Sequence, residues 1–135
     1  ARNARTMVNL ATEMLEKVKL VKDPSTGKPI ELRVGIHTGS IVAGVIGTKS
    51  LRYDIWGSDV LAANLMESNG KPSQIKVSEA THRVLEHVPG YEFKADTKVQ
   101  VKGSGEMQTY MLTAAPTMVG GKFVGLRDKD LHNMA

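Results

Sequence analysis

The first hydrophobic pattern along the chain is helical. Between Met7 and Val21, apolar residues recur at steps of three and four, which is the spacing of one face of an α-helix. The pattern predicts a helix over residues 2–22, ended by the turn-forming residues 23–27 (DPSTG). The apolar positions expected on its buried face are Met7, Leu10, Ala11, Met14, Val18 and Val21.

The next third of the chain has the patterns of strands. Apolar and polar residues alternate over residues 31–37, so this segment is predicted to be a strand. Residues 41–46 form a glycine-interrupted apolar run, which predicts a second strand in a hairpin with the first. Residues 52–56 are expected to continue in extended form.

Capping residues divide the second half of the chain. Ser58 or Asp59 is a favourable N-cap for a helix that is expected to end at Asn69-Gly70. A brief strand at residues 75–77 precedes a further helix, for which Ser78 is the predicted cap.

Two longer strands complete the pattern. Residues 91–102 and 108–112 are predicted to pair antiparallel across the turn at residues 103–105. Helices combined with mostly antiparallel strands predict an α+β domain over residues 1–115. Residues 116–135 show little periodicity and are interpreted as a tail or linker.

Composition narrows the function classes. The 135 residues suffice for one domain, and a formal charge of +4 is explained by a solvated lysine-rich surface, although it also suits an anionic partner. Aromatic residues make up 4%, too few for a base-stacking surface, so no nucleic-acid partner is expected. Without a long apolar run, this segment is expected to make no membrane contact. Zero cysteines exclude disulfides and thiolate metal sites and fit a cytoplasmic domain.

Several motifs in register give the chain a family likeness. Residues 4–114 closely resemble the central and C-terminal part of the catalytic domain of class III adenylyl and guanylyl cyclases. The motifs that carry the resemblance are LRVGIHTG (32–39), AGVIG (43–47), RYDIWG (52–57), MESNG (66–70), IKVS (75–78) and VKGSGEMQTY (101–110).

The resemblance implies a fold, a reaction and a partner. The fold would be a ferredoxin-like βαββαβ core with a C-terminal extension, the N-terminal part of the domain being missing from this chain. Two such domains would pair head to tail and bind nucleotide at the seam. The ribose 3′-hydroxyl of ATP, or less favourably GTP, would attack the α-phosphate, giving the 3′,5′-cyclic nucleotide and pyrophosphate. The parent protein could be membrane-anchored.

The resemblance also implies where the metal ions belong. The Mg²⁺ or Mn²⁺ ions of the family are bound by two aspartates that precede the first helix of this chain, so no metal ligand is expected here. Asp128 and Asp130 are the only close aspartate pair, but they lie in the tail and are interpreted as solvated charges.

The family's transition-state positions are altered. Active members carry asparagine and arginine four residues apart on the helix after the tryptophan-glycine turn, where this spacing puts both on one face. Here these positions are Leu61 and Leu65, which can neither donate a hydrogen bond nor carry charge. No catalytic residue is therefore expected in this chain.

Three residues match nucleotide-binding positions of the family. Arg33 is expected to contact phosphates, in preference to being an ordinary exposed strand residue. Asp54 matches the purine-reading position and favours ATP, unless the altered half-site reads no base. Lys102 matches a triphosphate-binding lysine; either the second site holds a ligand non-productively or Lys102 is a surface residue.

The remaining conspicuous residues have structural interpretations. His37 is expected to be a hydrogen-bonded or solvated histidine, and Trp56 to pack at the seam between two domains. Four glycines are expected to allow close approach to a partner or a positive φ, namely Gly35, Gly39, Gly44 and Gly47. The leading hypothesis is half of a nucleotide cyclase; the alternative is a catalytically dead pseudocyclase that acts as a dimerisation or regulatory module.

Overall fold

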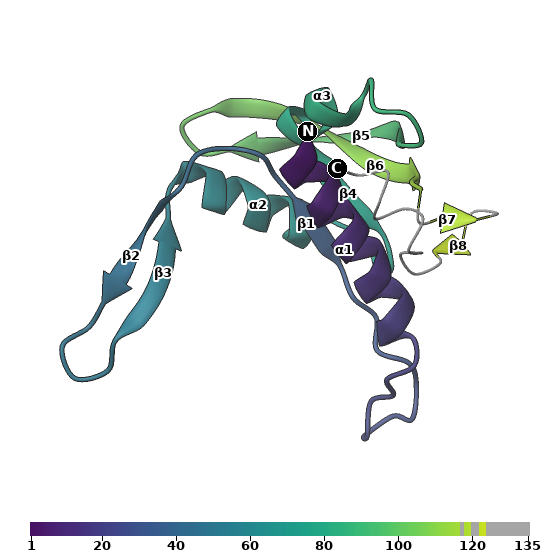
Figure 1. Cartoon of the computed structure of the whole chain (residues 1–135), viewed down its shortest axis with the longest axis horizontal. Helices are drawn as coiled ribbons and strands as arrows, with labels where there is room; N and C mark the ends of the chain where they lie inside the picture. The colour runs from purple at the N-terminus through teal and green to yellow at the C-terminus, as the bar shows by residue number, and fades with distance from the viewer. Residues whose placement is uncertain (117, 120–121, 124–135) are drawn as a thin grey trace.

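A four-stranded sheet forms the centre of the molecule (Figure 1). The computed structural model describes residues 1–116, 118–119 and 122–123. The sheet has the strand order β1–β4–β6–β5, in which β1 is parallel to β4 and the other pairs are antiparallel. This arrangement is the predicted α+β fold with mostly antiparallel pairing. The strands are β1 (Val34–Ile36), β4 (Ile75–Ser78), β5 (Glu92–Val101) and β6 (Gly105–Ala114).

Helices cover both faces of this sheet. α1 (Arg2–Val18) and α3 (Glu79–Leu85) pack on the face to which Ile36 points, whereas the neighbouring Gly35 faces α2 (Ser58–Ser68). This division follows from the alternation of side chains along a strand. The apolar core under α1 and α3 consists of Ala4, Val8, Ala11, Leu15, Ile36, Ile75, Val77, Leu85, Tyr91, Leu112 and Ala115.

The first helix forms as predicted but buries a different face. It ends at Val18 rather than at residue 22. Both stripes are apolar, so periodicity alone could not tell which one contacts the sheet. The apolar side chains that α1 buries are Ala4, Val8, Ala11 and Leu15. The side chains of the predicted face that are instead 46–49% exposed are Met7, Leu10 and Met14.

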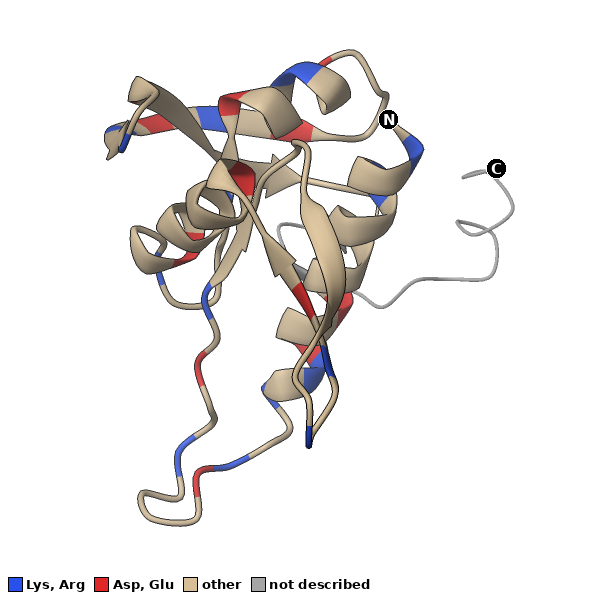
Figure 2. Cartoon of the chain, turned by 90° about the vertical axis from the view of Figure 1, so that its left-hand side faces the viewer, with Lys and Arg blue, Asp and Glu red and all other residues tan. Residues whose placement is uncertain are grey.

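A two-stranded hairpin projects from the body (Figure 1). It consists of β2 (Val42–Ile46) and β3 (Arg52–Trp56), paired antiparallel, and residues 42–56 are called the arm below. The predicted hairpin between residues 31–37 and 41–46 is therefore wrong, because β2 pairs with β3 and β1 pairs with β4. Figure 2 shows the arm as a mostly uncharged ribbon.

The arm leaves its apolar side chains uncovered. Only the central residue of each strand, Gly44 in β2 and Asp54 in β3, is even partly buried. The exposed apolar residues are Val42, Val45, Ile46, Leu51, Tyr53, Ile55 and Trp56.

The helix caps match the sequence patterns in part. Ser78 caps α3 as predicted, because its hydroxyl accepts from the backbone N–H of Thr81. Asn69 ends α2, also as predicted. The predicted N-cap of α2 is wrong: the cap is Gly57, whose φ of 134° suits a residue without Cβ.

The C-terminal segment is described only in part. Two short strands, β7 (Met118–Val119) and β8 (Lys122–Phe123), pair antiparallel within the segment predicted to be a tail. Asp128 and Asp130 lie outside the described residues. Among the described helices, none is long and apolar enough to cross a membrane.

Candidate functional site

Two glycines let α2 approach the end of β1 closely. A Cβ on Gly35 would lie 2.1 Å from the backbone nitrogen of Glu67, and one on Gly39 would lie 2.2 Å from Cγ of Asp59. Both distances are far below van der Waals contact. These glycines therefore serve packing within the chain, whereas approach to a partner was one of the predicted roles.

The remaining two glycines of the predicted set lie in or beside the arm. Gly47 follows β2 and has a φ of +110°, which confirms the predicted positive φ at this position. A Cβ on Gly44 would meet only a ring carbon of Trp56, at an ordinary 3.7 Å. Trp56 itself is 40% exposed, so its packing at a domain seam stays a prediction.

A set of hydrogen bonds joins the ends of β1, β4 and α2. We call it the His37 network; its side chains belong to His37, Thr38, Asp59, Ser78 and Thr81. His37 bonds to Ser78 Oγ through Nδ1 and to Asp59 Oδ1 through Nε2, at 2.7 Å each. The backbone N–H of Ser40 donates to Asp59 Oδ2 at 2.8 Å, and the hydroxyls of Thr38 and Thr81 are 2.9 Å apart.

This network satisfies its members without leaving a reactive group. The hydrogen bond from His37 and the backbone N–H of Ser40 lower the pKa of Asp59 below its ordinary value. The ionised carboxylate therefore accepts from His37 Nε2–H, and the other ring nitrogen, Nδ1, shares a hydrogen bond with Ser78 Oγ. Although serine, histidine and aspartate stand in a row, Ser78 is fully buried and caps α3, so no substrate could reach it.

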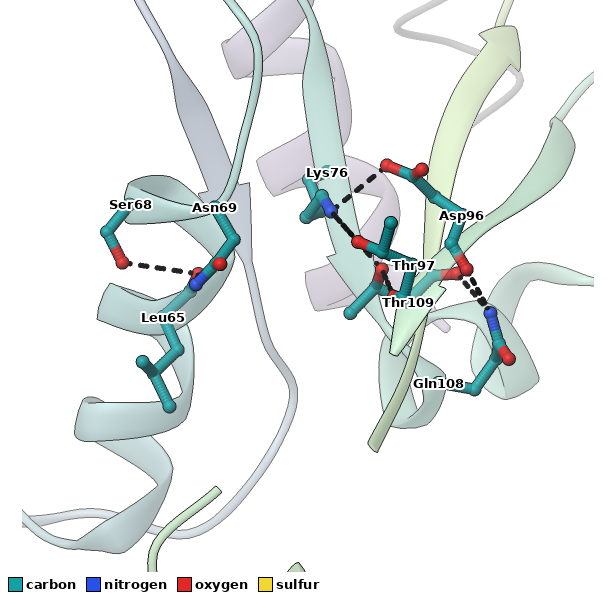
Figure 3. A network of polar contacts seen from close by, with 8 residues as sticks. All are labelled: Leu65, Ser68, Asn69, Lys76, Asp96, Thr97, Gln108 and Thr109. Atoms are coloured by element: carbon teal, nitrogen blue, oxygen red, sulfur yellow. Dashed lines mark hydrogen bonds and ion pairs between the residues drawn. The ribbon is translucent and has the colours of Figure 1, made fainter. Parts of the chain in front are cut away.

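The two leucines on α2 differ in exposure. Leu61 is 61% exposed on the first turns of the helix. Leu65 is partly buried, and its backbone carbonyl accepts from Asn69 Nδ2 at 2.9 Å and Ser68 Oγ at 3.4 Å (Figure 3). Neither side chain offers a polar atom.

Beside α2, the sheet contains a buried ion pair (Figure 3). Lys76 Nζ lies 3.0 Å from Asp96 Oδ2 and 3.3 Å from the hydroxyls of both Thr97 and Thr109. The hydrogen bond from Lys76 is the main reason that the pKa of Asp96 is lowered. A register shift in β5 between Ala95 and Lys98 frees the Asp96 and Thr97 carbonyls, and side chains of β6 donate to both.

Comparisons with known proteins identify the family. Residues 1–114 match the family described as the adenylate and guanylate cyclase catalytic domain. This chain belongs to that family. Rat guanylate cyclase soluble subunit beta-2 is 44% identical over 110 residues, covering 82% of this chain and 16% of the relative. Chicken adenylate cyclase type 9 is 40% identical over 107 residues, covering 79% and 8%. The chain thus spans less than one fifth of these relatives.

The fold is also that of a solved cyclase domain. The guanylate cyclase domain of RhGC from Catenaria anguillulae, solved in complex with GTP, matches with a TM-score of 0.75 and 32% identity. The match covers 85% of this chain and 62% of that structure. The class III cyclase resemblance expected from the motifs is therefore confirmed, as is the fold.

In this cyclase chain, Arg33 and Lys102 lie at opposite ends of the sheet. Arg33 immediately precedes β1, whereas Lys102 follows β5 at the turn into β6. Through the β1–β4 and β4–β6 registers, Arg33 lies level with residue 113 at the end of β6, whereas Lys102 lies level with residue 104 before its start. About nine residues, on the order of 30 Å at about 3.4 Å per residue, therefore separate the two. One chain therefore cannot bring both residues to a single triphosphate.

Arg33 and Asp54 each have a partner within the chain. Arg33 Nη2 lies 2.9 Å from Glu67 Oε1, and both side chains are about half exposed. Asp54 Oδ2 lies 3.5 Å from Arg52 Nη2, and its other oxygen accepts from the backbone N–H of Ile55. Their proposed roles toward nucleotide stay predictions.

The described residues do not fit a metal centre. Within them, no group of three or more histidine, aspartate or glutamate side chains is placed to hold an ion.

Sequence reasoning missed three residues of this region. Glu67 pairs with Arg33 across 34 positions, and Lys76 pairs with Asp96 across 20. No local pattern reports such contacts. A lysine inside the apolar run Ile-Lys-Val-Ser was the one available signal, because a buried lysine needs a partner.

Proposed function

We propose that the parent protein is a purine nucleotide cyclase. It would convert ATP, or alternatively GTP, into the 3′,5′-cyclic nucleotide and pyrophosphate between two cyclase domains. The observation that carries this proposal is the family match over residues 1–114, supported by adenylate and guanylate cyclase relatives at 40–44% identity.

Within that enzyme, this chain contributes binding rather than catalytic groups. Leu61 and Leu65 cannot stabilise charge on the reacting phosphate, so the half-site on this α2 is inactive. Arg33 retains several N–H donors besides the one that faces Glu67, and these suit the β- and γ-phosphates. Lys102, at the other end of the sheet, would lie at the second nucleotide site of the pair, which is the site altered by Leu61 and Leu65.

The second cyclase domain would pair with this chain through the arm. The arm exposes seven large apolar side chains, a concentration that soluble surfaces rarely keep uncovered. A head-to-tail partner would cover them and would supply the groups that this chain lacks. A cytoplasmic location for the domain, with or without a membrane anchor in the parent, is part of the same proposal.

The base preference needs a direct test, because Asp54 favours ATP only where the altered half-site still reads a base. A carboxylate accepts a hydrogen bond from the amino group of adenine, which favours ATP. The guanylate cyclase relatives favour GTP, so both nucleotides must be assayed.

A pseudocyclase is the second candidate. It is favoured by the ion pairs of Arg33 with Glu67 and of Asp54 with Arg52, because both nucleotide-binding candidates already have partners. In that case the domain would pair with a cyclase or regulate one without holding nucleotide.

The test is turnover of the full-length protein. Cyclic nucleotide formation should be measured with ATP and with GTP, each in Mg²⁺ and in Mn²⁺. Arg33→Ala should raise KM several-fold. The matched control is Arg83→Ala, which breaks an equally short arginine–glutamate contact on α3 and should leave KM nearly unchanged. Absence of turnover with either nucleotide would favour the pseudocyclase.

A further inference from the structure

The arm is attached to the body at two neighbouring points. The chain enters the arm after Ser40 and leaves it at Gly57, the N-cap of α2. Asp59 stands two residues past this exit. Both of its carboxylate oxygens bind the entering chain, one at His37 Nε2 and the other at the backbone N–H of Ser40. A single side chain therefore closes the base of the arm.

The same base is fixed to the end of the sheet. His37 Nδ1 bonds to Ser78 at the end of β4, and Thr38 bonds to Thr81 on the first turn of α3. The His37 side chain is 5% exposed and the Asp59 side chain 34%, so the imidazole lies inside the network and the carboxylate at its rim. The bond between His37 and the buried Ser78 is therefore the firmer attachment, because a hydrogen bond is electrostatically stronger away from water.

The base of the arm has no room for a side chain at Gly39, because the Asp59 carboxylate occupies that space. A Cβ on Gly39 would lie 2.2–2.5 Å from the three terminal atoms of the Asp59 side chain. The chain thus has glycine where the carboxylate lies against the entering backbone. Few other contacts hold the arm, whose strands are exposed on both faces.

We infer that Asp59 and His37 are positioning residues that fix the direction in which the arm projects from the body. The network ties the entry, the exit and the sheet together, so the arm is presented at one angle. A fixed arm reduces the entropy cost of ordering the interface on association. This consequence for domain pairing rests on the proposed function.

Pulsed EPR distance measurement on the full chain tests the inference. The protein has no cysteine, so Lys49→Cys near the arm tip and Lys94→Cys on β5 can be spin-labelled uniquely. Labelled chains are diluted with unlabelled ones, so that only distances within a chain are recorded. Asp59→Ala should broaden the distance distribution clearly, whereas Ser58→Ala, an exposed neighbour on the same turn, should leave it unchanged.

A milder variant separates positioning from general destabilisation. Asp59→Asn keeps the size of the side chain, but its amide has one acceptor oxygen where the carboxylate uses two, for His37 and for Ser40. Because it can keep one of the two bonds, it should broaden the distance distribution less than Asp59→Ala. Thermal unfolding of each variant is recorded in parallel. A distribution as narrow as wild type in both folded Asp59 variants would overturn the inference.

The outcome for pairing is read separately. If the proposed function also holds, Asp59→Ala should weaken association with the second cyclase domain several-fold. Broadening with unchanged association would support the positioning role and would count against pairing through the arm.

Discussion

β4 and the two strands of the arm are similar in sequence character and opposite in environment. All four residues of β4 are buried, whereas every residue of β2 and β3 except the central one is exposed. β4 has a strand on each side and helices over both faces, while each arm strand has one neighbour and no cover. The hydrophobicity of a strand therefore does not decide its burial; its neighbours do. β4 therefore contributes burial to the fold, whereas the arm contributes little, in keeping with the pairing role proposed for it.

Breaking the buried ion pair of the body should have the largest effect. Asp96→Ala leaves the Lys76 ammonium, whose side chain is 1% exposed, without its carboxylate. Loss of one partner of a buried pair costs about 3–5 kcal/mol. We expect a value at the lower end of this range, because the Asp96 side chain is partly accessible. Urea denaturation measures the change. The control is Glu106→Ala, which removes an exposed ion pair with Lys98 and should cost about 0–1 kcal/mol. Equal effects of both variants would contradict the assigned burial.

The next largest effect is expected from one added methyl group, which should destabilise the body but not the arm. Gly35→Ala would force Cβ into the α2 backbone, and overpacking of this kind costs about 1–3 kcal/mol or more. Gly44→Ala in the arm meets only an ordinary contact and should stay within about 0.5 kcal/mol of wild type. Thermal unfolding measured side by side gives the comparison. A larger loss for the arm variant would show that the arm, rather than the α2 contact, limits stability.

Polar substitutions in the arm should act on association instead of stability. Val45 and Tyr53 face each other across the hairpin and are 62% and 70% exposed. Replacing both by serine should change unfolding by less than about 0.5 kcal/mol. Sedimentation velocity over a range of concentrations should show weaker self-association or partner binding than wild type. Thr48→Ala is the control near the tip, and equal association in all three proteins would argue against an interface here.

The smallest expected effect concerns acid stability. The pKa of Asp96 is lowered in the folded chain, chiefly by its hydrogen bond from Lys76, from an ordinary value of 3.8. The unfolded chain therefore binds the proton first, and the stabilisation is present above pH 3.8 and is lost as pH falls through the lowered folded pKa. Between pH 5 and pH 3, the free energy of unfolding should fall more steeply for wild type than for Asp96→Asn. Parallel curves would mean that Asp96 does not contribute to this slope.

The sequence predicted the helices and strands better than it predicted which strands and side chains contact one another. The helices and the longer strands follow from periodicity and capping, and Ser78 and Asn69 cap where expected. The pairing of β2 was wrong, because a hydrophobic run does not specify which strand it joins. The N-cap of α2 was wrong because the carboxylate of Asp59 binds His37 and Ser40 instead of its own helix.

For the site, sequence motifs located the residues but not their contacts. Leu61 and Leu65 lie on α2 as the motif required. The separation of Arg33 from Lys102 depends on strand register, and the Arg33–Glu67 pair depends on how α2 packs over Gly35. Register and packing join residues far apart along the chain, so no local pattern contains them.

We propose that this chain forms the inactive half of an asymmetric cyclase pair. The most direct test is the double substitution Leu61→Asn and Leu65→Arg in the complete catalytic pair, with domain affinity and turnover measured together. Burial of a leucine against the partner contributes about 1.5–3 kcal/mol, and polar groups would enter a surface not shaped for them. We therefore expect weaker pairing and no gain in turnover. Unchanged affinity with nearly doubled turnover would contradict the account, because the second site would then be intact except for these two residues.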